Sequence, residues 1–135
     1  MTAAPVSRKQ TILLVDDEAT VRLLTTRLLE EQGYSVIEAG DGFVAWTLLE
    51  SKVEHIDLVI SDVVMPRLDG LELARCMELM PHPPPILLMS GYGLSALEFE
   101  GPLLVKPFRG HELLAAVHHL LAAPGVDDPE NSDAS

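Results

Sequence analysis

The sequence predicts an α/β fold in which one parallel sheet of five strands is covered by helices on both faces, giving three layers. Short apolar runs alternate five times with segments of helical periodicity. The connections between them have the length that right-handed crossovers need. With 135 residues, the chain has room for one domain with a substantial core.

The first two strand–helix units come before the central strand. The apolar run 11–15 predicts a strand, and the periodic segment 19–32 predicts a helix that stops at Gly33. Residues 34–39 predict the second strand, and a turn leads into a helix over 42–52. The buried side of the first helix is predicted to consist of Val21, Leu24, Leu28 and Leu29.

The stretch 56–62 is the predicted centre of the sheet. Its branched side chains suit a strand buried on both faces, and Asp62 stands where that strand should end. Pro66 and Gly70 mark a loop before the third helix, so Asp62 should lie at the carboxyl edge of the sheet, where open α/β folds bind ligands. The buried side of the third helix is predicted from Leu71, Ala74 and Met77, with Leu79 as a further candidate.

The last two predicted strands are 86–89 and 103–105, followed by Ser90 and Lys106 respectively. The segment 94–100 between them has room for at most two helical turns before a glycine and a proline, so this helix should be short. The final helix, from about Gly110, should bury Leu113, Leu114, Val117, Leu120 and Leu121.

The predicted domain spans residues 8–123. Residues 1–7 are expected to be flexible, and the acidic segment 124–135 is expected to be a disordered tail. A flavodoxin-like sheet with strand order 2-1-3-4-5 and about five helices is the natural arrangement of these units.

The composition narrows the class of protein. A formal net charge of -12 argues against direct nucleic-acid binding, because a phosphate backbone is bound mainly by Lys and Arg. Cys76 is the only cysteine, so no internal disulfide is possible. We find no signal peptide and no apolar run long enough to span a bilayer. We therefore expect a cytoplasmic protein that is not inserted in a membrane.

Under this fold, the ends of four strands bring Asp16, Asp17, Asp62, Ser90 and Lys106 to one edge of the sheet. Neighbouring carboxylates repel one another by about 4 kcal/mol per close pair at an effective dielectric of 20. A hard divalent cation such as Mg²⁺, which prefers oxygen ligands, would compensate this charge. Lys106 and Ser90 could then hold phosphoryl oxygens.

Each of these residues also has an ordinary interpretation when it is taken alone. Acids after strands, including Asp16, Asp17 and Asp41, are often helix N-caps. Lys106 alone would be a solvated lysine, and Ser90 alone a turn residue. Their joint placement favours a site. The histidines on or near the last helix have no metal-ligand spacing and predict surface or packing roles; they are His111, His118 and His119.

Over about residues 8–123, these features resemble the receiver domain of two-component response regulators. The matching residues are Asp16 and Asp17 after the first strand, Asp62 within the segment 62–70 (DVVMPRLDG), Ser90 after the fourth strand, and Lys106-Pro107-Phe108 after the fifth.

The resemblance implies that Asp62 accepts a phosphoryl group from a histidine kinase or a histidine phosphotransfer protein. It implies a Mg²⁺ ion bound by Asp17, Asp62 and the backbone carbonyl of Val64, with Asp16 helping through water. It further implies that Lys106 and Ser90 are catalytic and that the bond before Pro107 is cis. No other enzymatic activity is expected, apart from the protein's own phosphorylation and slow autodephosphorylation.

In receivers, the positions of Val64 and Tyr92 tune hydrolysis. Neither residue here is an acid or amide that would position water, so we expect a long-lived phosphorylated state.

Two departures from the family's pattern concern signalling. Leu103 stands where most receivers have a switching Tyr or Phe, and Tyr92 or Phe99 is a candidate substitute for that aromatic side chain. The second departure is the short span from Ser90 to Lys106, which leaves the fourth helix stunted or replaced by a loop. The surface that this helix builds with the fifth strand and the last helix is then altered as a dimer or output face.

The leading hypothesis is a stand-alone response regulator or phosphorelay shuttle that is a monomer or a weak dimer. One alternative is a phosphatase or phosphotransferase with an aspartyl-phosphate intermediate, similar to haloacid-dehalogenase-like enzymes. Those enzymes carry a second acid two residues after the nucleophile, where this chain has Val64. Another alternative is a pseudo-receiver that binds its partner without phosphorylation. The resemblance identifies the class of partner and not the individual kinase or downstream target.

Overall fold

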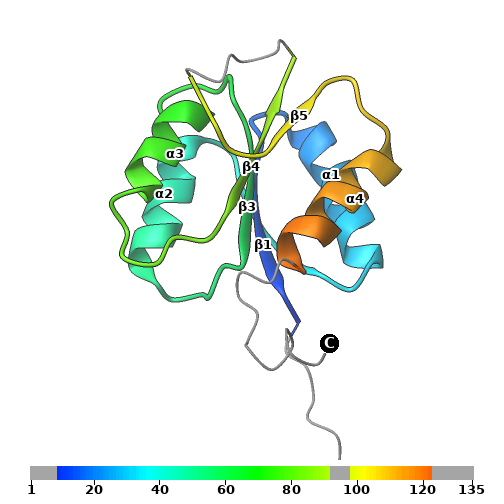
Figure 1. The fold of residues 1–135 in the computed structure, drawn as a ribbon, viewed down its shortest axis with the longest axis horizontal. Coiled ribbons are helices and arrows are strands. Elements are labelled where there is room, and N and C mark those ends of the chain that lie inside the picture. The colour runs from blue at the N-terminus through cyan, green and yellow to red at the C-terminus, as the bar shows by residue number, and fades with distance from the viewer. Residues whose placement is uncertain (1–8, 92–97, 123–135) are drawn as a thin grey trace, which may run out of the picture.

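Five short apolar runs form the strands of one parallel sheet in the computed structural model of the chain (Figure 1). The structure describes residues 9–91 and 98–122. The strands are β1 (Thr11–Val15), β2 (Ser35–Ala39), β3 (Leu58–Asp62), β4 (Ile86–Ser90) and β5 (Leu103–Val105). Their order, β2-β1-β3-β4-β5, confirms the predicted flavodoxin-like topology.

The register of the strands determines what meets at the carboxyl edge of the sheet. Asp62, the last residue of β3, pairs with Met89, and Ser90, the last residue of β4, pairs with Val105. All four pairings are parallel, so every strand ends at the same edge. Side chains that follow these strands are therefore collected at one place.

The helices form the two outer layers. In the described residues they are α1 (Ala19–Glu31), α2 (Gly42–Ser51), α3 (Gly70–Met77) and α4 (Gly110–Leu121). Figure 1 shows α1 and α4 on one face of the sheet and α2 and α3 on the other. The sheet is covered on both sides, which explains why its strands are almost continuously apolar.

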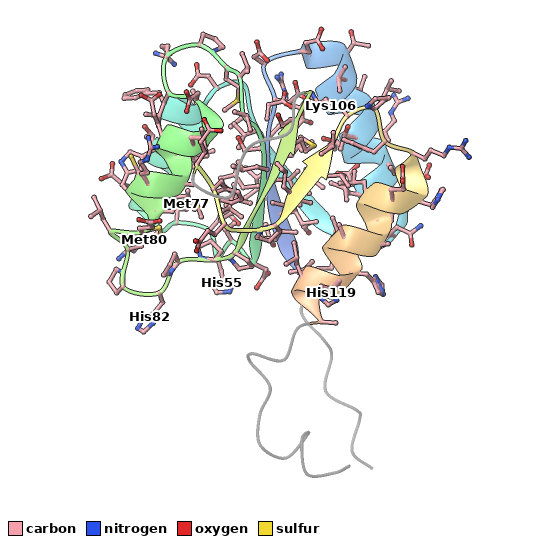
Figure 2. The ribbon with its side chains drawn as sticks, turned by 45° about the horizontal axis from the view of Figure 1, so that its top comes forward. His55, Met77, Met80, His82, Lys106 and His119 are labelled. Atoms are coloured by element: carbon pink, nitrogen blue, oxygen red, sulfur yellow. The ribbon has the colours of Figure 1, made fainter. Side chains whose placement is uncertain are left out.

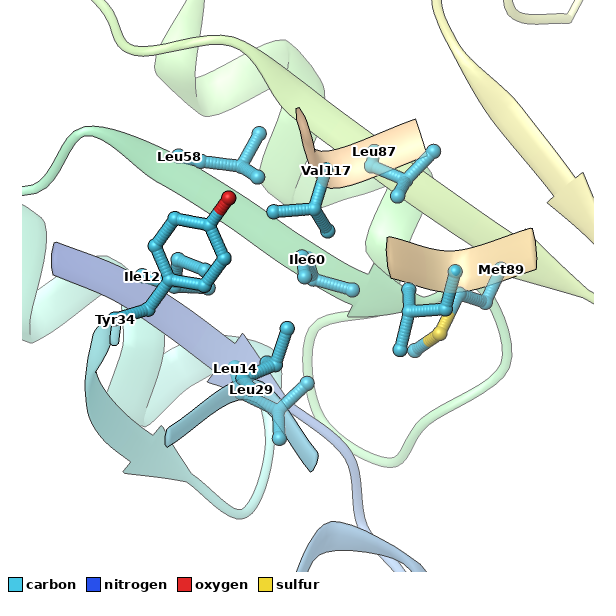
Figure 3. Close-up of a cluster of buried hydrophobic side chains, with 10 residues drawn as sticks. Ile12, Leu14, Leu29, Tyr34, Leu58, Ile60, Leu87, Met89 and Val117 are labelled. Atoms are coloured by element: carbon cyan, nitrogen blue, oxygen red, sulfur yellow. The ribbon is translucent and has the colours of Figure 1, made fainter. Parts of the chain in front are cut away.

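Alternate residues of the central strands enter two separate hydrophobic cores. Ile12 and Leu14 of β1 face α1 and α4, whereas Leu13 and Val15 face α2 and α3. The first core is shown in Figure 3; its buried residues are Ile12, Leu14, Leu29, Tyr34, Leu58, Ile60, Leu87, Met89, Leu113 and Val117. Of the side chains predicted for the final helix, Leu113 and Val117 are buried and the others are partly buried.

Only part of the connection between β4 and β5 is described. Its described residues, Gly91 and 98–102, contain no helix. The rest of the connection, 92–97, lies outside the described residues, as do the segments 1–7 and 124–135 that were predicted to be flexible. The described part of the chain thus has four helices, whereas about five were predicted.

The predicted buried side of α1 was wrong in part. Val21 is 39% exposed and Leu24 is 59% exposed, while Thr26 and Leu29 are buried. The less exposed stripe of α1 therefore lies about one residue further along than predicted, and it includes Arg22, whose Nη1 donates to the Asp16 carbonyl at 2.6 Å. Helical periodicity considers only the spacing of apolar residues, so it does not predict a polar contact of this kind.

The predicted buried side of α3 also needs one correction. Leu79 is 81% exposed because α3 ends at Met77, so that Leu79 lies beyond its last turn. The fully buried Leu73 takes its place in the core between α2 and α3.

Candidate functional site

Three carboxylates meet at the carboxyl edge of the sheet. Asp16 and Asp17 directly follow β1, and Asp62 ends β3. One oxygen from each of the three carboxylates lies within 4.8 Å of the other two. Asp16 and Asp62 are 2% and 5% exposed, whereas Asp17 is exposed to solvent. This group could hold a metal ion that is reached from the open side.

Backbone contacts fix the position of Asp16. Its N–H donates to the carbonyl of Ala39 at 3.1 Å, and its Oδ1 accepts the N–H of Glu18 at 2.9 Å. The carbonyl of Asp16 accepts from Arg22, whose Nε also donates to Glu38 Oε1 at 2.9 Å. The turn after β1 is therefore held by β2 and α1 together, and the acidic pair has a defined place.

Lys106 supplies the positive charge at the site. Its Nζ donates to Asp62 Oδ1 at 2.7 Å, and its backbone N–H donates to the carbonyl of Ser90 at 2.8 Å. The bond between Lys106 and Pro107 is cis. Figure 2 shows Lys106 at the end of the sheet opposite to His55, His82 and His119.

The electrostatics of Asp62 depend on burial more than on its ion pair. Burial, followed by the neighbouring Asp16 carboxylate, raises the pKa of Asp62 to about 6, although the Lys106 ammonium lowers it. Burial would also lower the pKa of Lys106, but the hydrogen bond to Asp62 and the charges of Asp16 and Glu18 raise it overall. One lysine thus does not compensate the negative charge of the site.

The loop after β3, residues 63–69, is closed tightly over the end of the strand. The N–H of Gly70 donates to the Val63 carbonyl at 2.8 Å, and a Cβ atom on Gly70 would overlap the carbonyl oxygen of Asp62. Asp69 and Glu72 form a reciprocal capping box that starts α3. The Val64 side chain lies in this loop and is 76% exposed.

The residues predicted to tune or switch the site are more dispersed. Leu103 lies in β5 and pairs with Leu88 of β4. Phe99 packs over Gly101 and lines a cavity of about 650 Å³ between α3 and the segment 98–102. None of the three clustered aspartates lines that cavity. Tyr92 lies outside the described residues.

Two basic residues near the site were not found from the sequence. Arg22 supports the turn at Asp16, as described above, and Arg67 donates to Asp41 at 3.0 and 2.8 Å. Asp41 was identified as a possible N-cap, and it does cap α2 through the N–H of Val44 at 2.9 Å. The second partner of Asp41, Arg67, lies in a loop 26 residues further along the chain. No sequence motif connects the two residues.

The histidines have contacts of other kinds. Tyr34 Oη lies 3.2 Å from His118 Nδ1, and His55 Nε2 lies 3.0 Å from Asp57 Oδ1. Burial raises the pKa of Tyr34. Among the residues that the structure describes, no histidine belongs to the group that could hold a metal ion.

The described helices were also compared with the length and hydropathy that a membrane span requires. None of them is long and apolar enough to cross a lipid bilayer.

Comparisons with known proteins agree with this geometry. The family model of the response regulator receiver domain matches residues 12–118. The chain is 38% identical over 127 residues to sensor kinase CckA of Brucella abortus, covering 88% of the chain and 13% of the relative. It is 36% identical over 128 residues to response regulator MprA of Mycobacterium ulcerans, covering 90% of the chain and 54% of the relative.

A solved structure also matches the chain. Response regulator protein TrrA of Thermotoga maritima, crystallised in complex with Mg²⁺ and BeF, has 34% sequence identity and a TM-score of 0.73. The match covers 83% of this chain and 99% of that one. The chain thus spans a small part of the sensor kinase, about half of the response regulator MprA, and nearly all of the TrrA structure. With its sheet order, its acidic edge and these matches, the chain belongs to the family of response regulator receiver domains.

Proposed function

We propose that Asp62 accepts a phosphoryl group from the phosphohistidine of a histidine kinase or histidine phosphotransfer protein. The observation that carries the proposal is the position of Asp62: it is buried at the carboxyl edge beside two other carboxylates, with Lys106 Nζ at 2.7 Å. A carboxylate in this place is a nucleophile that is aligned by its surroundings and reached from one side.

Mg²⁺ fits the residues of this site. Asp16, Asp17 and Asp62 offer only hard oxygen donors, and a bound cation would offset the repulsion between the Asp62 and Asp16 carboxylates. Asp17, Asp62 and the Val64 carbonyl would hold the ion, with Asp16 acting through water. When it is bound, the ion supplies neutralisation of the charge on the phosphoryl oxygens.

The remaining chemistry belongs to the side chains of the chain. The oxygen of Asp62 forms a bond to phosphorus as the bond from phosphorus to the donor imidazole nitrogen breaks, and the imidazole leaves with its electron pair. Lys106 stabilises the charge of the phosphoryl oxygens, and the Ser90 hydroxyl donates to one of them. Because the ionised form predominates above the pKa of about 6, Asp62 is available as a nucleophile at neutral pH.

Slow hydrolysis is part of the proposal. The Val64 side chain has no group that donates or accepts a hydrogen bond, and it is largely exposed. It therefore does not orient a water molecule for attack on the phosphoryl group. Apart from its own phosphorylation and dephosphorylation, the domain acts by binding partners: the phosphoryl donor and a downstream protein.

Intact mass spectrometry tests the assignment. The chain is incubated with acetyl phosphate and Mg²⁺, and we expect a gain of one phosphoryl group that is lost in Asp62→Asn and in the presence of EDTA. Asp69→Asn serves as a matched control, because Asn also caps helices and Asp69 lies outside the three clustered aspartates. A phosphoryl gain that persists in Asp62→Asn would refute the assignment of the phosphoacceptor.

A further inference from the structure

The loop between β3 and α3 is held against the start of α2 by Arg67. Its Nε and Nη2 donate to Asp41 Oδ2 at 3.0 and 2.8 Å, and its Cζ lies 4.9 Å from the centre of the Phe43 ring. A guanidinium that makes two bonds to one carboxylate and lies over an aromatic ring is fixed in position and in plane. Arg67 thus ties the loop to a neighbouring helix.

The carboxylate that receives Arg67 is itself fixed. Asp41 uses Oδ1 to cap α2 through the N–H of Val44, and Oδ2 for Arg67. The side chain of Asp41 is only 14% exposed. The two segments also meet through their backbones, because a Cβ atom on Gly42 would overlap the carbonyl oxygen of Leu68. The loop therefore meets the start of α2 through both side-chain and backbone contacts.

The backbone of Arg67 shows why the loop needs this support. Its φ of 71° lies in the left-handed region, which residues with a Cβ atom rarely adopt. Such a conformation persists where surrounding contacts hold it. Arg67 follows Val64 by three residues in the same loop, and the apolar Met65 and Leu68 of this loop belong to the core that α2 and α3 cover. The contact with Asp41 adds a polar restraint between these two apolar ones.

We propose that Arg67 is a positioning residue for the metal ion. It holds the loop against α2 and so sets the place of the Val64 carbonyl. This inference rests on the proposed function, in which that carbonyl binds Mg²⁺. Simple electrostatics predict the opposite effect for a loss of Arg67: removal of a positive charge near an acidic cluster should strengthen cation binding. The direction of the change therefore separates positioning from charge.

An NMR titration with Mg²⁺ measures this direction, and the amide spectrum shows that each variant is folded. We expect Arg67→Ala to weaken Mg²⁺ binding about tenfold, the lower end for residues that orient metal ligands. Asp41→Asn should have a similar effect, because asparagine still caps α2 but has lost its negative charge. The double variant should bind no more weakly than either single variant, since both remove one contact.

A second readout separates positioning from a general loss of structure. The rate of phosphorylation by acetyl phosphate should fall in Arg67→Ala at low Mg²⁺ and return to the wild-type value at saturating Mg²⁺. Arg67→Lys should restore part of the affinity, because lysine keeps the charge but not the two-bond geometry. Arg27→Ala, which removes an exposed arginine from the middle of α1, should leave the affinity unchanged or slightly higher.

The outcomes are distinct for the two proposals. If Arg67→Ala binds Mg²⁺ as tightly as the wild type or more tightly, the positioning role is refuted while phosphorylation of Asp62 stands. If Arg67→Ala and Asp41→Asn weaken binding by independent amounts that add in the double variant, the role is also refuted. If the wild type itself neither binds Mg²⁺ nor gains a phosphoryl group, the proposed function fails first.

Discussion

Replacing Asp62 by asparagine should stabilise the metal-free protein at neutral pH. The ionised carboxylate is buried at 5% exposure beside Asp16, and its pKa of about 6 lies above the ordinary value of 3.8. This difference corresponds to a cost of about 3 kcal/mol for ionised Asp62 in the folded state. Asparagine removes the charge and still offers Lys106 a carbonyl oxygen, so most of this free energy should be recovered.

The pH dependence gives the prediction its sign. An acid whose pKa is raised by folding contributes stability below the unfolded pKa of 3.8, and that stability is lost as the pH rises through about 6. At pH 7.5, Asp62→Asn should therefore be more stable than the wild type by about 1 to 3 kcal/mol. At pH 4, where the wild-type carboxyl is mostly neutral in the folded state, the gain should fall below about 1 kcal/mol.

Urea unfolding followed by circular dichroism, in EDTA at both pH values, measures these differences. Mg²⁺ should then stabilise the wild type and have little effect on Asp62→Asn, because the variant lacks one ligand. A variant that is less stable than the wild type at pH 7.5, or equally stabilised at both pH values, would show that Asp62 is not strained by its charge.

Three further predictions concern residues around Asp62. In Lys106→Ala, the pKa of Asp62 should rise further, because burial and the Asp16 carboxylate remain while the ammonium is lost. NMR titration measures this pKa, and an unchanged value would contradict the ion pair. Phosphorylation of this variant should slow by about 10²-fold. Gly70→Ala should lower the free energy of unfolding by about 1 to 3 kcal/mol or prevent folding, because its Cβ overlaps the Asp62 carbonyl. Gly91→Ala, with nothing near a new Cβ, should change stability by less than about 0.5 kcal/mol, and equal effects would reject the steric argument. Asp69→Ala should lose about 1 kcal/mol through the capping box, while Asp69→Ser should retain most of it; similar losses in both would contradict a capping role.

The sequence was most informative where a pattern has a local physical cause. The five strands and their order follow from short apolar runs that alternate with helical segments, because a sheet buried on both faces requires such runs. The carboxyl edge then collects Asp16, Asp62, Ser90 and Lys106 from four different strands, since parallel strands all end there.

Local patterns were less informative where a distant contact decides the outcome. The buried side of α1 departs from its apolar periodicity and includes Arg22, which reaches the Asp16 carbonyl and Glu38. Leu79 was expected to be buried, but α3 ends two residues before it, and no capping residue in the sequence marks that end. Helix boundaries and rotations thus depend on partners that periodicity does not contain.

The sequence by itself determined the topology and the types of residue at the site. Both depend on composition and on short-range order, which the chain carries in every conformation. Only the tertiary structure decided the balance of charges at Asp62 and the support of its loop. The raised pKa of Asp62 arises from burial and from Asp16, 46 residues away, and the loop is held by Arg67 through Asp41, the N-cap of α2. The pKa of Asp62 and the Arg67–Asp41 contact depend on distances between residues that are far apart in the sequence and on exclusion of water. Both are established only when the chain has folded.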